Sequence, residues 1–273
     1  MYPDFIDLNR ISQLKKEGRL IPPPEMIKTK KQIAGIKEAC TLNTMLLDYL
    51  EPHVKAGVST LEIDNLTLEF TSSHNAVCAD FGYMGYPKHI CTSVNDVVCH
   101  GIPSADVVLQ DGDIINIDAT TMYNDYYGDA SRTFVIGKVH PLIENLVHHT
   151  KEALEKAIDA IVPYETTIGD IGEIIENYAN EHDLSVVKEF TGHGVGLALH
   201  EEPYVYHFKP NEKTYTIIPG MVFTIEPMLN LGGEEIFIDE EDQWTVYTED
   251  GYPSCQFEHT ILITPEGVEI LSK

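Results

Sequence analysis

The feature that most constrains the fold is a set of carboxylates placed inside runs of apolar residues. Asp118 ends the segment IINID, Glu226 lies in FTIEPM, and Glu258 lies in CQFEHTILI. A carboxylate buried in such a strand loses its hydration, which is expensive unless the charge is paired or bound to a metal. The chain must therefore fold so that these acids meet positive charge.

A fourth acid, Asp129, opens the strand that follows Asp118. A turn near Tyr123 and Asn124 would pair residues whose numbers sum to 247, which predicts that Asp118 and Asp129 lie directly opposite each other. Like charges in that position repel, and a bound cation would remove the repulsion. For this hairpin alone the alternative stays open that one Asp caps a turn while the other faces solvent.

His193 lies in the segment TGHGVG, where the flanking glycines are expected to allow unusual backbone angles and to leave room around the imidazole. Carboxylates and an imidazole suit Co, Mn, Fe(II), Zn or Mg better than metals that prefer thiolates. Two divalent ions would balance four negative charges and lower the pKa of a shared water, which is hydrolytic chemistry. The predicted ligands of these ions are Asp118, Asp129, His193, Glu226 and Glu258.

Apolar periodicity predicts helices over 29–49 and 141–161, and the capping boxes STLE (59–62) and TIGD (167–170) each open a further helix. Strands rich in Val, Ile, Thr and aromatic residues are predicted over 113–120, 129–135, 221–228 and 256–264. The apolar positions after the first cap recur after the second at an offset of 108: Ile63, Leu66 and Phe70 match Ile171, Ile174 and Tyr178. This repeat favours two related halves, each with helices packed on strands.

Residues 1–25 are predicted to be an N-terminal extension, because they contain a run of three prolines that favours a stiff extended linker. Residues 26–273 are predicted to be a single catalytic domain. Residues 1–37 hold eight basic and four acidic residues, whereas the whole chain has a net charge of -26. Two interpretations stay open: a solvated basic leader, or a docking element for an acidic partner such as the ribosome.

The composition excludes several classes of protein. The negative charge argues against DNA or general nucleic-acid binding, because neutralising phosphates requires Lys and Arg. No stretch approaches the roughly 18 apolar residues of a membrane span, and the N-terminus lacks the pattern of an export signal. The five cysteines match no zinc or disulfide framework, which indicates reduced thiols in a cytoplasmic protein. A monomer is the default expectation.

Eight short segments identify a family by their order and spacing. They are FGYMGYPK (81–88), NDVVCHGIP (95–103), INID (115–118), GD (128–129), GHGVG (192–196), HEEP (200–203), TIEPM (224–228) and QFEHT (256–260). From about residue 26 onward the chain resembles the type 1 methionine aminopeptidases. The resemblance implies an α+β pita-bread fold, with two pseudo-symmetric halves and a curved antiparallel sheet covered by helices. It also implies removal of the initiator methionine from peptides and nascent proteins, with a small second residue preferred.

The resemblance assigns a role to each predicted ligand. Asp118 would chelate one divalent ion, and His193 and Glu226 would chelate the other. Asp129 and Glu258 would bridge both ions. Glu226 would also accept and pass on a proton from the attacking water.

The resemblance further implies that His100 contacts the substrate near the scissile amide and that His200 hydrogen-bonds the scissile carbonyl. A thioether prefers polarizable and aromatic surroundings. The implied methionine pocket is lined by Tyr83, Tyr86, Cys91, Leu199 and Trp244. Two positions depart from the family pattern: Asp80 stands where a small or apolar residue is common, and Leu199 stands where an aromatic residue is common. An implied monovalent cation site comprises Asn95, Val97 and Ser254.

Two other interpretations stay open. A prolidase or Xaa-Pro aminopeptidase shares the fold, but those enzymes usually carry a large separate N-terminal domain, and here fewer than 30 residues precede the matching region. A non-catalytic binding protein of the same fold is the second, and such relatives tend to lose metal ligands. Only 26 residues separate His200 from Glu226, which leaves no room for the long insertion of type 2 enzymes.

Overall fold

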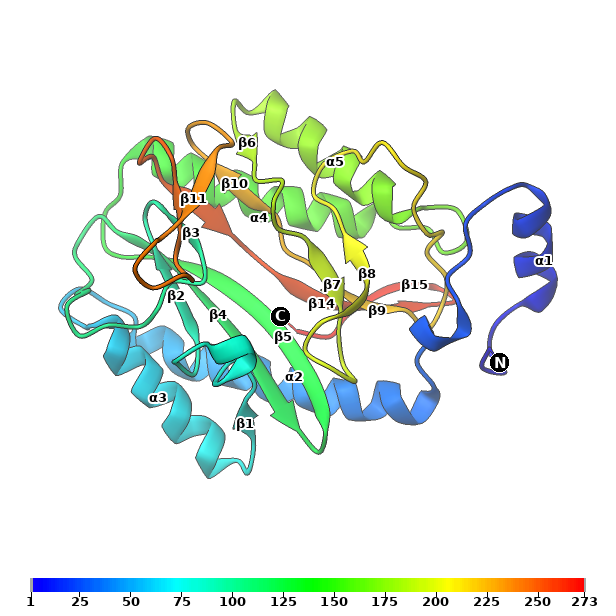
Figure 1. The fold of residues 1–273 in the computed structure, drawn as a ribbon, viewed down its shortest axis with the longest axis horizontal. Coiled ribbons are helices and arrows are strands. Elements are labelled where there is room, and N and C mark those ends of the chain that lie inside the picture. The colour runs from blue at the N-terminus through cyan, green and yellow to red at the C-terminus, as the bar shows by residue number, and fades with distance from the viewer. Residues whose placement is uncertain (1, 273) are drawn as a thin grey trace.

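The computed structural model describes residues 2–272. Its strands form the middle of the molecule and its long helices cover them from outside (Figure 1). The α-helices are α1 (Leu8–Lys16), α2 (Lys30–Leu50), α3 (Thr60–Ser73), α4 (Pro141–Asp159) and α5 (Ile168–Glu181). Single-turn 3-10 helices occur at η1 (Pro24–Met26), η2 (Glu51–His53) and η3 (Tyr83–Gly85). Within residues 2–272, none of the helices combines the length and apolar character that a bilayer span requires.

The first half of the molecule is a four-stranded antiparallel sheet covered by α2 and α3 (Figure 1). Its strands are β1 (Val77–Cys78), β2 (Cys91–Val94), β4 (Ile114–Tyr123) and β5 (Tyr126–Val135). β4 lies between β1 and β2 at one edge and β5 at the other. Leu46, Leu47 and Ile63 from the helices join Ile115 and Ile117 of β4 in one buried core.

The second half is a five-stranded antiparallel sheet covered by α4 and α5 (Figure 1). Its strands, in spatial order, are β15 (Gly267–Ile270), β14 (His259–Thr264), β9 (Val222–Ile225), β7 (Gly192–Gly194) and β8 (Glu201–Val205). Leu154 of α4 and Ile171 of α5 share a core with Phe223 and Ile261 of the sheet. This half therefore repeats the helix-on-sheet arrangement of the first.

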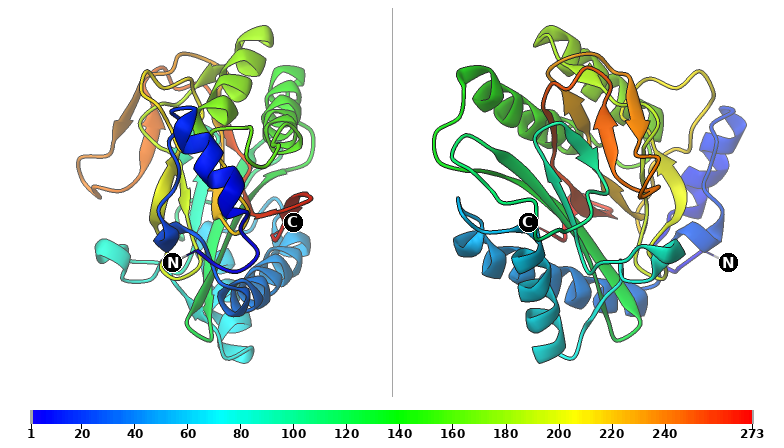
Figure 2. Two further views of the ribbon diagram at one scale, coloured as in Figure 1. Left: turned by 90° about the vertical axis from the view of Figure 1, so that its right-hand side faces the viewer. Right: turned by 60° about the vertical axis from the view of Figure 1, so that its left-hand side comes forward.

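Two smaller antiparallel sheets of three strands each accompany the two larger sheets. One has the order β13 (Ser254–Gln256), β10 (Met228–Asn230), β6 (Ser185–Val186). The other has the order β11 (Ile236–Ile238), β12 (Val246–Thr248), β3 (Val97–Cys99). The hairpin of β11 and β12 projects at one end of the molecule in Figure 2.

The predicted internal repeat is confirmed at the helix starts. Ser59 and Thr167 both form complete capping boxes, and α3 and α5 have 14 residues each. The equivalent positions Ile63 and Ile171 are both fully buried. Each half thus covers its sheet with an equivalent capped helix, because each of these helices must bury one apolar face.

The N-terminal segment packs on the second half of the molecule, and part of it forms the helix α1. The side chain of Asp7 caps α1 by accepting hydrogen bonds from the backbone N–H groups of residues 9 and 10. Ile11 is buried in the core of the second half, and Leu14 is also buried. Leu20 forms a β-bridge with Tyr215. Figure 2 shows α1 lying against the side of the molecule.

Candidate metal centre and substrate cavity

Asp118 and Asp129 lie on neighbouring strands, but they are not directly opposite each other. The register pairs Asp118 with Ser131 and Thr120 with Asp129, so the paired numbers sum to 249 and the predicted 247 is wrong. The cause is the turn, whose residues 124–125 both have positive φ and stand one position later than predicted. Because side chains alternate along a strand, the two carboxylates still lie on the same face of the hairpin.

Glu226 and Glu258 lie side by side where two ladders meet. His259 pairs with Ile225, and Gln256 pairs with Met228. Both pairs belong to one register. Residues 226–227 and 257–258, which lie between these pairs, belong to neither ladder. The strands predicted over 221–228 and 256–264 are therefore each divided in two, with the carboxylate at the break.

Backbone chemistry explains the two breaks. Pro227 has no N–H to donate to a ladder. The N–H of Glu226 donates to Nε2 of His207 (3.2 Å), and the N–H of Glu258 donates to the carbonyl of Ser131 on β5 (3.1 Å). The chain thus turns both glutamates away from regular pairing and toward the β4–β5 hairpin.

His193 enters the same space from β7. Its Nδ1 contacts the carbonyl oxygen of Gly194 (3.0 Å), and this hydrogen bond requires the proton on Nδ1 and leaves the Nε2 lone pair free. A Cβ at Gly192 would lie 2.6 Å from the carbonyl of Thr224, and a Cβ at Gly194 would lie 2.2 Å from that of Glu202. Neither glycine has a positive φ, so these glycines serve close strand packing and the expected unusual backbone angles are wrong.

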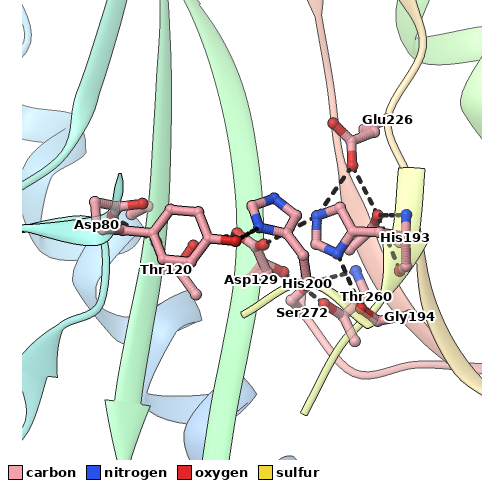
Figure 3. Close-up of polar contacts among 12 residues, drawn as sticks. Asp80, Thr120, Asp129, His193, Gly194, His200, Glu226, Thr260 and Ser272 are labelled. Carbon is pink, nitrogen blue, oxygen red and sulfur yellow. Dashed lines mark hydrogen bonds and ion pairs between the residues drawn. The ribbon is translucent and has the colours of Figure 1, made fainter. Parts of the chain in front are cut away.

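Three of the predicted ligands already form a compact donor set. Ligand atoms of Asp129, His193 and Glu258 all lie within 4.8 Å of one another. Nε2 of His193 is 3.7 Å from Asp129 Oδ2 and 3.6 Å from Glu226 Oε1 (Figure 3). Glu226 is itself held by a hydrogen bond from Thr224 Oγ1 (2.7 Å). Free nitrogen and carboxylate oxygens at these separations fit a divalent cation.

The electrostatics of the cluster also fit a bound cation. Burial raises the pKa of Asp118 to about 7 and that of Glu226 to about 8, the latter with a contribution from Asp118. Burial likewise raises the pKa values of Asp129 and Glu258 far above the usual carboxyl range. Burial lowers the pKa of His193 to about 3, so its imidazole is neutral. Divalent cations would supply the positive charge that these carboxylates lack.

A cavity of about 310 Å³ opens onto this cluster. Every predicted ligand lines it, together with His100, His200 and every residue of the predicted side-chain pocket. The lining residues are Asp80, Tyr83, Met84, Tyr86, Cys91, His100, Asp118, Thr120, Asp129, Glu189, Phe190, Thr191, His193, Leu199, His200, Glu226, Met228, Trp244 and Glu258. Segments from residue 80 to residue 258 therefore converge on one space.

The two histidines are held by aromatic neighbours. Nδ1 of His200 is 2.8 Å from the hydroxyl of Tyr83, and its ring meets that of His193 edge-on at 4.2 Å. His100 has a left-handed backbone (φ 56°) and packs edge-on against Phe190 and Trp244. Burial lowers the pKa of His100 to about 4 and also lowers that of His200. Both rings are therefore neutral near pH 7 and each can donate one hydrogen bond.

Several cavity residues were missed by the sequence analysis. Thr120 follows Asp118 by two positions, so strand alternation places it on the same face, and its hydroxyl donates to Asp129 (3.0 Å). Phe190 directly precedes the segment that carries His193, and this position was the only feature of the sequence that pointed to Phe190 as a cavity residue. Met228 follows Glu226 by two positions.

The three residues of the implied monovalent cation site lie together but outside the cavity lining. The N–H of Ser254 donates to the carbonyl of Asn95 (2.9 Å), which has a left-handed backbone (φ 52°). Val97 starts β3 and pairs with Tyr247.

Comparison with known proteins assigns the chain to a family. The model of metallopeptidase family M24 matches residues 34–265. Methionine aminopeptidase A of Synechocystis sp. is 46% identical over 245 residues, which cover 89% of this chain and 96% of that protein. The crystal structure of methionine aminopeptidase from Rickettsia prowazekii superposes with a TM-score of 0.87 at 42% identity and covers 90% of this chain and 99% of that one.

The chain therefore belongs to metallopeptidase family M24, the family of pita-bread fold hydrolases, and within it to the methionine aminopeptidases. An Xaa-Pro dipeptidase from Bacillus anthracis has a TM-score of 0.72 at 23% identity, with 91% of this chain and 62% of that chain covered. That likeness concerns the fold alone. The antiparallel sheets, the helical cover and the two related halves agree with the predicted α+β pita-bread fold class.

Proposed function

We propose that this protein removes the N-terminal methionine from peptides and nascent proteins by hydrolysis of the first peptide bond. The observation that carries the proposal is the convergence of buried carboxylates, a neutral imidazole and an aromatic side-chain pocket on one cavity. The methionine aminopeptidases at more than 40% identity support the same activity. The preferred second residue is a small one.

We propose that two divalent cations, Co, Mn, Fe(II) or Zn, occupy the cluster. Asp118 would hold one ion, and His193 with Glu226 would hold the other. Asp129 and Glu258 would bridge the two. When bound, such a pair lowers the pKa of water and polarises the scissile carbonyl.

The side chains around the ions do the remaining work. Glu226 would accept the proton of the attacking water and pass it to the leaving amine, as a carboxylate in contact with the reacting groups can. His200 donates a hydrogen bond to the oxygen that becomes negative during attack. His100 orients the scissile amide. Tyr83 holds the His200 ring by its hydroxyl at 2.8 Å.

The methionine side chain would lie among soft and aromatic groups. Tyr86 is buried and its ring meets that of Trp244 edge-on at 5.1 Å. Cys91 and Leu199, also buried, complete the wall. A thioether gains favourable contacts with aromatic rings and with sulfur, which these four side chains offer.

The direct test is to strip the protein of metal and restore Co, Mn, Fe(II), Zn and Mg one at a time. Release of methionine from Met-Gly-Met and of the first residue from an Xaa-Pro peptide would be measured in parallel. We expect methionine release only after a metal is restored and little cleavage of Xaa-Pro. Preferential Xaa-Pro cleavage would indicate a prolidase, and no release with any metal would indicate a binding protein.

We also propose that the basic N-terminal segment contacts the ribosome and that the protein is a cytoplasmic monomer. Three basic residues of this segment are already engaged within the protein: Lys28 is buried, Lys30 pairs with Asp4, and Lys37 pairs with Glu269. The last turn of α1 keeps two exposed lysines, Lys15 and Lys16. The five buried free cysteines support a reducing compartment.

Reversing the charge of Lys15 and Lys16 to Glu should weaken co-sedimentation with ribosomes and leave peptide cleavage unchanged. A control with the same charge change, Lys151→Glu with Lys156→Glu on the exposed face of α4, should co-sediment like the parent protein. Equal co-sedimentation of both variants would refute ribosome docking through α1.

A further inference from the structure

Lys28, which joins the N-terminal segment to α2, is completely enclosed. Its side chain is 1% exposed, although lysine is almost never fully buried without a partner. Its backbone N–H donates to the carbonyl of Gly220 (2.8 Å), which fixes the chain at the start of the catalytic domain. The ammonium therefore needs a dedicated counter-charge inside the protein.

That counter-charge is Glu201, the first residue of β8. Lys28 Nζ lies 2.5 Å from Glu201 Oε2. The other carboxylate oxygen, Oε1, accepts hydrogen bonds from the N–H groups of Leu197 (2.7 Å) and Ala198 (3.3 Å). One carboxylate thus joins a buried lysine to the backbone of the loop that precedes it.

This loop carries two residues of the substrate cavity. Leu199 and His200 both line the cavity. In the sequence they follow the two residues whose amides Glu201 binds, and they directly precede Glu201. The loop makes one tight internal hydrogen bond, from Gly196 N–H to Ala198 carbonyl (3.2 Å). The His200 ring then reaches the Tyr83 hydroxyl and the edge of His193.

Energetics favour a role for the pair beyond stability. The ammonium of Lys28 loses its hydration completely, whereas the side chain of Glu201 is 19% exposed. An ion pair with such a desolvation cost often adds little to stability relative to apolar side chains of similar volume. It does restrict geometry, since the carboxylate must stay where the ammonium and both amides can reach it. The neutral hydrogen-bond donor at His200 is useful only if its ring is held at one distance from the scissile carbonyl.

We propose that Lys28 is a positioning residue that acts through Glu201 to hold the loop of Leu197–His200 in its cleavage-competent shape. The inference rests on the proposed function, because it gives His200 a part in peptide cleavage. It also links the end of the N-terminal segment to the cavity by a single chain of contacts.

The test is a double-mutant cycle on metal-restored protein with Met-Gly-Met as substrate. Lys28→Met should lower kcat by 10- to 100-fold and change KM by less than threefold. In a His200→Ala background the same change should lower kcat by less than twofold, because the loop then has no donor to position. Lys28→Arg should restore part of kcat. The control Lys30→Met, two residues away at an exposed site, should behave like the parent protein.

Amide hydrogen exchange gives a readout that is independent of activity. In Lys28→Met the N–H groups of Leu197 and Ala198 should exchange at least tenfold faster, whereas those of the β4–β5 hairpin should not change. Glu201→Gln should show the same two effects, so it replaces Lys28→Met if that variant does not fold. Equal proportional losses of kcat with and without His200, unchanged exchange in the loop, or failure of both variants to fold would overturn the proposal. An inactive parent protein would refute the proposed function instead and leave the exchange result to decide the contact.

Discussion

At the scale of single residues, Asp80 is the position where this cavity departs most from an apolar methionine pocket. Its Oδ2 accepts the N–H of Thr120 (3.1 Å), and its carboxyl lines the cavity beside Cys91. Burial, with a contribution from Asp118, raises the pKa of Asp80 to about 8. A carboxyl at the pocket wall is polar in either protonation state, and the loss of its hydration opposes burial of a thioether beside it.

We therefore predict that Asp80→Asn lowers KM for methionyl peptides about threefold to tenfold, which corresponds to roughly 1 kcal/mol. The amide oxygen can still accept the Thr120 N–H, so the loop should keep its shape. Steady-state kinetics on Met-Gly-Met, with metal at saturation, measures the change. Asp106→Asn, in an exposed loop, is the matched control and should leave KM unchanged. An unchanged or higher KM for Asp80→Asn would show that the carboxyl does not oppose the thioether.

At the scale of elements, α2 and β5 pack in very close backbone contact next to the metal centre. A Cβ at Gly128 would lie 2.4 Å from the backbone nitrogen of Cys40 and 2.5 Å from the carbonyl carbon of Ala39. Only a glycine allows the helix backbone to approach the strand so closely. Because Gly128 directly precedes Asp129, helix packing and ligand position are coupled at this point.

Gly128→Ala should destabilise the protein by about 1–3 kcal/mol, because the helix must move away from the strand. It should also weaken metal binding, since Asp129 moves with β5. Thermal unfolding and titration of the metal-stripped variant with Mn measure the two effects. The control is Gly233→Ala, where the added Cβ lies 3.7 Å from its nearest neighbour and should be tolerated. Parent-like stability and metal affinity in Gly128→Ala would refute the coupling.

At the scale of the whole molecule, the cavity concentrates groups that resist ionisation. Asp118, Asp80 and Glu226 keep their protons in the metal-free fold until their pKa values of about 7, 8 and 8, whereas unfolded carboxyls ionise near pH 4. Between these limits the folded state binds more protons than the unfolded state, so the free energy of unfolding falls as pH rises. His100 and His193, whose pKa values are lowered, destabilise the fold only below about pH 6.5.

We accordingly expect the melting temperature of metal-free protein to fall between pH 6.5 and 8. Saturating Mn should remove most of this decline, because the cation takes the place of the bound protons, and its stabilising effect should be larger at pH 8 than at pH 6.5. Calorimetry with and without Mn at pH 6.5 and pH 8 tests this. In Glu258→Gln the melting temperatures with and without Mn should differ less than in the parent protein. A melting temperature of metal-free protein that rises over this range would reject the expected charge imbalance.

Much of the architecture follows from local signals. The capping boxes at Ser59 and Thr167 and the periodic helices after them are confirmed, because caps and apolar faces act within one or two turns. The face shared by Asp118 and Asp129 was also predictable, since a register error of two keeps every side chain on its side of the sheet. The turn at residues 124–125 was missed because several adjacent polar residues tolerate positive φ.

By itself, then, the sequence determined which residues are too polar for the strands that contain them, and from this a cation-binding cavity follows. Only the tertiary structure decided how the strands accommodate them. Glu226 and Glu258 interrupt their ladders because His207 and Ser131, from other parts of the chain, take their backbone N–H groups. The sequence indicates that Lys28 is one charge in a solvated basic leader, yet its side chain is buried and pairs with Glu201, 173 residues away. Such pairings depend on which segments meet in space, and no local pattern encodes that.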